Sequence, residues 1–182
     1  MISRTPLILP ALLLALLTCL PVNAQRDHLT PQEVDLVKEA QILDKRIEVF
    51  IKAADRRLMV LNGTQSANAK QLKKDAELWG DLPTGSHGDL LGDIAGILDE
   101  AITNIDDVSS RDERNPLIPK ALRRLAEAVN NIMTQVAPFR DQAKSDGEVA
   151  SLESLNEEAQ QILEAAKKLP PPEPEKKAKK KN

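Results

Sequence analysis

The spacing of apolar residues between positions 122 and 139 constrains this chain more than any other feature. These residues lie three or four positions apart: Leu122, Leu125, Val129, Ile132, Val136 and Phe139. That spacing places them on one face of an α-helix. It recurs in two further series: Leu91, Ile94, Leu98, Ala101, Ile105 and Val108, and then Leu152, Leu155, Ala159, Ile162, Ala166 and Leu169. Because no such helix can bury its apolar face alone, the sequence predicts an all-α helical bundle.

The boundaries of the expected helices follow from capping residues, prolines and glycines. Thr30 and Glu33 form a capping-box pair, as do Ser145 and Glu148, and each pair precedes an apolar series. We expect four main helices, over residues 30–61, 89–108, 115–139 and 145–169, in an antiparallel bundle. A short helix over residues 66–79 would bridge the first two, and no segment shows a convincing strand pattern.

The first 24 residues have the pattern of a secretory signal peptide. Arg4 precedes an apolar run from Leu7 to Leu17, and Ala24 ends a small-residue cleavage motif. The apolar run is too short to span a bilayer, which takes about 20 residues. We therefore expect an exported protein, periplasmic or extracellular after cleavage near Ala24, with no transmembrane span in the mature chain. The alternative is a lipoprotein acylated at Cys19, but Thr18 is bulkier than the residue usual before such a cysteine.

Charge divides the remaining chain into two parts. Residues 25–169, the expected bundle domain, carry 19 basic and 26 acidic side chains, whereas residues 170–182 carry five lysines and two glutamates. The acidic balance argues against nucleic acid as a partner of the bundle. The proline-rich and lysine-rich end has the composition of a disordered tail. With no cysteine beyond Cys19, the mature chain would have no disulfide, which fits a bacterial envelope compartment better than a small extracellular module of animal type.

Two features suggest binding surfaces. The tail lysines could hold anionic lipid head groups or envelope polymers: Lys176, Lys177, Lys179, Lys180 and Lys181. The alternative is that the tail only keeps the protein soluble. Gly88, Gly92 and Gly96 are four residues apart and would form a smooth track for a close helix or partner, or simply a loosely formed surface helix.

No catalytic or cofactor motif is recognisable, and we predict no catalytic residue, cofactor or metal ligand. The nearest approach to a metal site is the set Asp81, His87, Asp89 and Asp93, whose spacing matches no known ligand pattern, and Asp89 has the simpler role of a helix cap. The sequence therefore favours a non-enzymatic interaction or structural protein of the bacterial cell envelope. The alternative is a periplasmic bundle that binds a small ligand or a metal.

Overall fold

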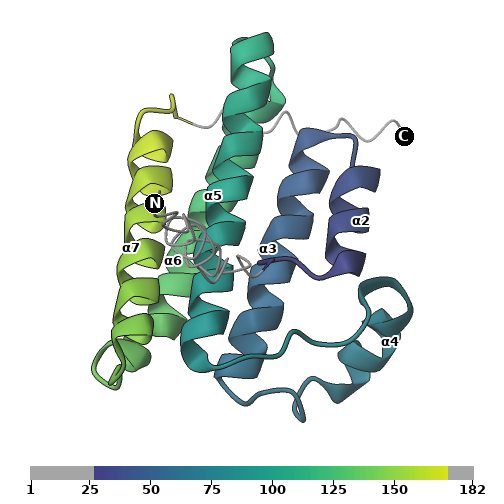
Figure 1. Ribbon diagram of the computed structural model, residues 1–182. Coiled ribbons are helices and arrows are strands. Elements are labelled where there is room, and N and C mark those ends of the chain that lie inside the picture. Colours follow the sequence, from purple (N-terminus) through teal and green to yellow (C-terminus); the bar gives the residue numbers. More distant parts are fainter. Residues whose placement is uncertain (1–26, 172–182) are drawn as a thin grey trace, which may run out of the picture.

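The structure, a computed structural model, describes residues 27–171 and is all-helical over that range (Figure 1). Its helices, in chain order, are α2 (Pro31–Glu39), α3 (Leu43–Leu61), α4 (Ala69–Trp79), α5 (His87–Arg111), α6 (Leu117–Arg140) and α7 (Asp146–Lys167). None of them combines the length and the apolar character that crossing a bilayer requires. The predicted signal peptide, Cys19 and the lysines of the tail lie outside the described residues.

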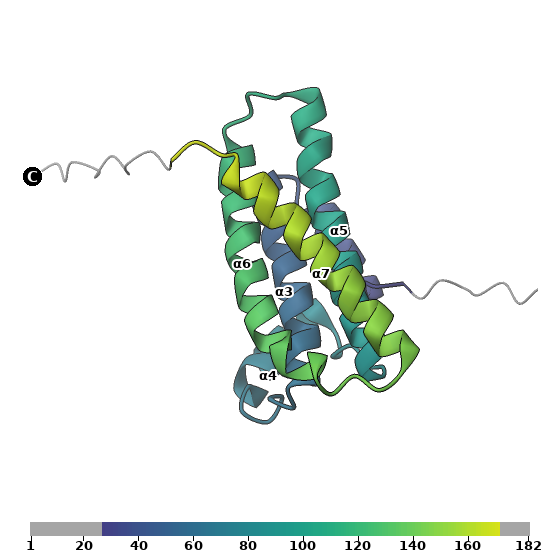
Figure 2. The same cartoon turned by 90° about the vertical axis from the view of Figure 1, so that its left-hand side faces the viewer.

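The four long helices form a bundle in which each helix runs opposite to the long helix before it (Figures 1 and 2). Helix α7 lies between α5 and α6, and α3 contacts α5 and α6 from the other side. The short connection from α5 to α6 crosses a diagonal of the bundle. As a result, two neighbouring pairs, α3 with α6 and α5 with α7, run parallel, a detail that the predicted antiparallel bundle does not contain.

Ion pairs show the parallel register of α3 and α6. Lys120 donates to Asp44 at 2.5 Å, and one turn further along both helices Arg124 pairs with Glu48. Between α5 and α7 the register is shown by Gly88, which lies against Glu148, and Gly92, which lies against Ser151. In both pairs the residue numbers rise together along the two helices, as parallel packing requires.

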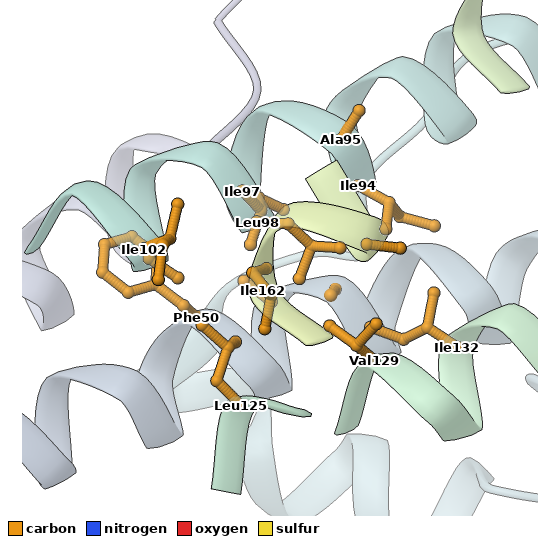
Figure 3. Packing of buried hydrophobic residues seen from close by; sticks show 14 of the residues in the cluster. Phe50, Ile94, Ala95, Ile97, Leu98, Ile102, Leu125, Val129, Ile132 and Ile162 are labelled. Carbon is orange, nitrogen blue, oxygen red and sulfur yellow. The ribbon is translucent and has the colours of Figure 1, made fainter. Parts of the chain in front are cut away.

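The core consists of the apolar faces that the sequence spacing predicts (Figure 3). Side chains from all four long helices meet there, including Phe50 of α3, Leu98 of α5, Ile132 of α6 and Ile162 of α7, none of which is exposed to solvent. The ends of the series, Val108, Phe139 and Leu169, are only partly buried and pack against the edge of this cluster.

The single helix predicted over residues 30–61 is wrong, because the chain breaks between α2 and α3. Ala40 leaves the helical region, and the Arg46 Nε donates to its carbonyl oxygen at 2.9 Å. In one continuous helix, Glu33 and Arg56 would be about 35 Å apart, at 1.5 Å per residue. The break allows α2 to fold back along α3, which brings these two residues into contact.

Helix α5 is longer than predicted at both ends. Ser86, not Asp89, is the N-cap residue, and Asp89 completes the capping box from the third helical position. At the other end α5 continues to Arg111, through polar residues whose composition predicts a connection instead of a helix. The short helix α4 is attached mainly by its last residue, Trp79, which is its only buried side chain.

Candidate functional site

Four charged side chains are buried together where α2, α3 and α5 meet. None is more than 4 % exposed, and we call them the ion cluster: Glu33, Arg56, Arg57 and Asp93. Their formal charges cancel. Burial of isolated charges would cost several kcal/mol each, so the cluster depends on its internal pairing.

Glu33 joins the cap of α2 to both arginines. Its Oε2 accepts from the backbone N–H of Thr30 at 2.9 Å, which completes the predicted capping box. Its Oε1 accepts from Arg56 Nε at 3.2 Å and from Arg57 Nη1 at 2.7 Å. The carboxylate therefore stabilises the start of the helix and neutralises two guanidinium groups at once.

Arg56 holds the loop that follows α4. Its Nη2 donates to the carbonyl oxygens of Trp79, Gly80 and Asp81 at 3.1, 3.2 and 2.5 Å. The Trp79 ring lies 5.6 Å from the guanidinium carbon and 4.6 Å from Lys52 Nζ, which are cation–π distances. Burial lowers the pKa of Arg56 from its ordinary value, and the neighbouring Glu33 opposes this effect.

Arg57 is more completely enclosed but less completely paired. Its Nη1 also donates to the Ala53 carbonyl at 3.0 Å, and its Nη2 donates to the His28 carbonyl at 2.7 Å. Its Nε lies 3.7 Å from Asp93 Oδ2, which is an ion-pair distance but too long for a hydrogen bond. Within the described residues, this buried Nε has no hydrogen-bond partner.

The segment before α2, residues 27–30, lies across α5 and is called the strap here. His28 Nε2 is 2.8 Å from Glu100 Oε2, and the His28 carbonyl is held by Arg57. The ring of His28 lies so close to Gly96 that a Cβ at that position would be 2.9 Å from His28 Cγ. The side chain of Leu29 is buried in the core.

The predicted glycine track faces other parts of the same chain. A Cβ on Gly88 would be 3.4 Å from Glu148, one on Gly92 would be 3.3 Å from Ser151 Oγ, and Gly96 faces His28. These glycines allow the start of α7 and the strap to approach α5 closely. Docking of a separate partner along the track remains a prediction.

Two open hollows lie on either side of the strap, and Asp93 lines both. The glycine hollow, of about 410 Å³, includes the track and the first turns of α5 and α7. The Arg57 hollow, of about 430 Å³, lies between the strap, the start of α2 and the loop before α5. Both volumes fall in the range of small-ligand sites.

The residues considered as a metal site do not converge. Asp89 is engaged in the capping box of α5, and the His87 ring lies edge-on to Phe139 at 5.5 Å. Asp81 lines only the Arg57 hollow, whereas Asp93 lines both hollows and shares the glycine hollow with Asp89. Between residues 27 and 171, no three histidine, cysteine or acidic side chains are grouped so that they could hold a metal ion.

Sequence reasoning missed the ion cluster, although one signal of it was present. Arg57 lies three residues after Ala54 and four before Leu61, and therefore falls on the buried face of α3. An arginine in an apolar series requires a partner from elsewhere, because a buried charge is costly when unpaired. Nothing in the spacing identified Glu33 as that partner.

Comparison of the chain with known protein families, with curated proteins and with solved structures finds no match in any of the three.

Proposed function

We propose that this protein is an exported, non-enzymatic binding protein of the bacterial cell envelope, held to an anionic surface by its C-terminal lysines. The observation that carries the proposal is the opposite charge of the two parts of the chain. Residues 25–169 hold 19 basic and 26 acidic side chains, whereas the last thirteen residues hold five lysines and two glutamates. An acidic body is repelled by an anionic surface, so attachment has to come from the tail.

The described end of the chain supports this arrangement. Helix α7 ends at Lys167, and Arg123 of α6 donates to the Pro170 carbonyl. The tail therefore starts from a defined point on the bundle surface. Lysines near an anionic membrane surface contribute about 1 kcal/mol each, so five of them are sufficient for reversible attachment.

The use of the buried charges supports a binding role over a catalytic one. Arg56 and Arg57 direct most of their hydrogen bonds to backbone carbonyls and to Glu33, which holds the loop and the strap in place. Arginines whose hydrogen bonds are used in this way fix the backbone of the loop and the strap, and so they fix the shape of the surface there. Catalytic groups, by contrast, have to reach a reacting atom of the substrate.

The test is sedimentation of the mature chain, beginning at Gln25, with lipid vesicles. Vesicles containing about 30 % phosphatidylglycerol should retain the protein at low salt and release it as salt rises, because screening weakens the attraction. Replacing all five tail lysines by glutamine should abolish retention. A matched variant with Lys70, Lys73 and Lys74 of α4 replaced by glutamine should bind as the wild type does. Equal retention of the tail variant and the wild type would reject the proposal.

A second candidate function, binding of a small ligand, is favoured by one specific observation. The Arg57 hollow has a ligand-sized volume, and residues from four separate segments of the chain line it. The same purified protein can be tested for ligand binding without the vesicles, because the described residues that line the hollow all belong to the helical bundle.

A further inference from the structure

An open groove of about 490 Å³ follows the seam between the parallel helices α3 and α6, and we call it the α3–α6 groove. Helix α3 contributes Ile51 and Asp55 to its lining, and helix α6 contributes Glu127, Ala128 and Asn131. Ile51 and Ala128 are partly buried, whereas Asp55, Glu127 and Asn131 are exposed. The groove therefore offers an apolar strip with accessible polar groups beside it.

The charge left over in the α3–α6 groove is negative. Its two cations already have carboxylate partners, because Arg124 pairs with Glu48 and Lys52 pairs with a carboxylate of α4. Asp55 and Glu127, by contrast, make no ion pair or side-chain hydrogen bond within the described residues. Atoms around the carboxyl group of Asp55 exclude part of its water and raise its pKa. A positively charged group in the groove would therefore meet two accessible carboxylates.

The C-terminal tail starts close to this groove. The end of α7 lies against the start of α6 (Figure 2). There Arg123 of α6 donates to the carbonyl oxygen of Pro170. Glu127 is four residues further along α6, which is about one helical turn or 6 Å along the axis. The described end of the chain is thus about one turn of α6 from the nearest carboxylate of the groove.

The tail is long enough to bring its lysines into the groove. Lys176 is five residues beyond Pro171, and Lys181 is ten residues beyond it. At the rise of an extended proline-rich chain, about 3.1 Å per residue, these lysines reach about 15–30 Å from Pro171. The part of α6 from Arg123 to Asn131 is only about 12 Å long. Every point of the groove along α6 therefore lies within reach of at least one tail lysine.

We propose that residues 172–182 dock in the α3–α6 groove, with their lysines beside Asp55 and Glu127, when no anionic surface is present. This segment holds five lysines and two glutamates, so its charge is opposite to that of the groove. Exposed ion pairs are weak individually, but a tethered segment has a high effective concentration near its site. The same lysines cannot hold the groove and an anionic surface together. The groove would therefore regulate the attachment proposed above, and this consequence rests on that function, whereas the docking itself does not.

The docking is tested by NMR on the mature chain, beginning at Gln25, with a nitroxide spin label on Asn182→Cys. Because Cys19 is the only cysteine of the sequence, the mature variant is labelled at this single position. At low salt the label should broaden the backbone amide resonances of Asp55, Glu127 and Asn131. About 0.5 M salt should restore them, because screening weakens the attraction. Normal amide intensities in the groove at low salt would overturn the proposal.

Substitutions of exposed carboxylates locate the docking site. Asp55→Asn combined with Glu127→Gln should abolish the broadening in the groove. The matched control is Asp106→Asn combined with Asp107→Asn, at exposed positions of α5, and it should leave the broadening unchanged. Both variants remove two surface charges, so their folds should be intact. If the control lost the broadening and the groove variant kept it, the groove would be rejected.

Vesicle binding tests the regulatory consequence separately. The groove variant and the α5 control variant have the same net charge, so repulsion between the bundle and an anionic surface is matched. The groove variant should bind phosphatidylglycerol vesicles at least about threefold more tightly, because its tail is free of the competing carboxylates. Equal binding of the two variants would overturn the competition. If neither these variants nor the wild type bound vesicles, the proposed function would fail, and the spin-label result would still decide whether the tail docks.

Discussion

Two parts of the interior are both buried but differ in the side chains that form them: one part is apolar and the other is charged. The centre of the bundle is apolar, and side chains such as Ile132 and Leu125 have no exposed surface. The ion cluster, at the corner where α2 packs, is just as buried but consists of two arginines and two carboxylates. The apolar centre tolerates many arrangements of similar volume, whereas the cluster is stable only when each charge meets its own partner. The centre therefore drives folding, and the cluster determines where α2, the strap and the loop before α5 are placed.

The largest effect should come from a charge placed in the apolar centre. Ile132→Asp should lower the free energy of unfolding by more than about 4 kcal/mol, because no partner for the carboxylate lies nearby. Circular dichroism and thermal melting measure this. The neighbouring Asn131 is exposed, so Asn131→Asp is the matched control and should change stability by less than about 0.5 kcal/mol. A normal melting curve for Ile132→Asp would show that the core is wrongly assigned.

A smaller but still large effect is expected when a charge is removed from the ion cluster. Glu33→Gln keeps the shape of the side chain but leaves two buried guanidinium groups with one carboxylate fewer. The expected loss is about 3–5 kcal/mol in chemical denaturation. Glu39→Gln, on an exposed position of the same helix, should be nearly neutral. If both variants were equally stable, the cluster would contribute nothing to the fold.

The contact between the strap and α5 gives the next prediction. The effect of Gly96→Ala on stability should change sign when the His28 side chain is removed. Glycine in a helix costs about 1 kcal/mol relative to alanine, but a Cβ at Gly96 would be 2.9 Å from the His28 ring. Gly96→Ala should therefore destabilise the wild type by about 1 kcal/mol and stabilise a His28→Gly variant, which has no Cβ in the contact, by a similar amount; a double-mutant cycle measures both effects. Gly147, where a Cβ would meet no atom within 4 Å, should gain stability from alanine in both backgrounds. An effect of the same sign in both backgrounds at Gly96 would contradict the packing of the strap.

The smallest effect concerns a carboxylate between α5 and α7. Burial, together with the charges of Asp99 and Glu157, raises the pKa of Glu158, and its Oε2 has no hydrogen-bond partner in the described residues. A raised pKa means that the contribution of this group to stability is present at low pH and is lost as pH rises through the folded-state value. Glu158→Gln should therefore stabilise the protein slightly at neutral pH and have no effect at acidic pH. Melting temperatures at both pH values provide the comparison.

The apolar centre and the ion cluster also differ in how far the sequence predicts them. The apolar series on α5, α6 and α7 could be predicted, because helical spacing is a local property of the chain. Partners 23 and 24 residues apart, such as Glu33 with Arg56 and Arg57, could not be found in this way. The break after Glu39 was missed for the same reason: no glycine or proline marks it, and its stabilising contacts include Arg46, beyond the break. In the candidate site, the sequence suggests Asp93 only as a metal ligand, and its position near Arg57 required the tertiary structure.

The position of α7 between α5 and α6 has a consequence for the order in which the chain can fold. Synthesis releases the chain from its amino-terminal end, so α7 is the last of the described helices to become available. Until then α5 and α6 each present an uncovered apolar face to water or to a chaperone. The apolar faces of α5 and α6 are therefore fully covered only after the 22-residue helix α7 has been synthesised.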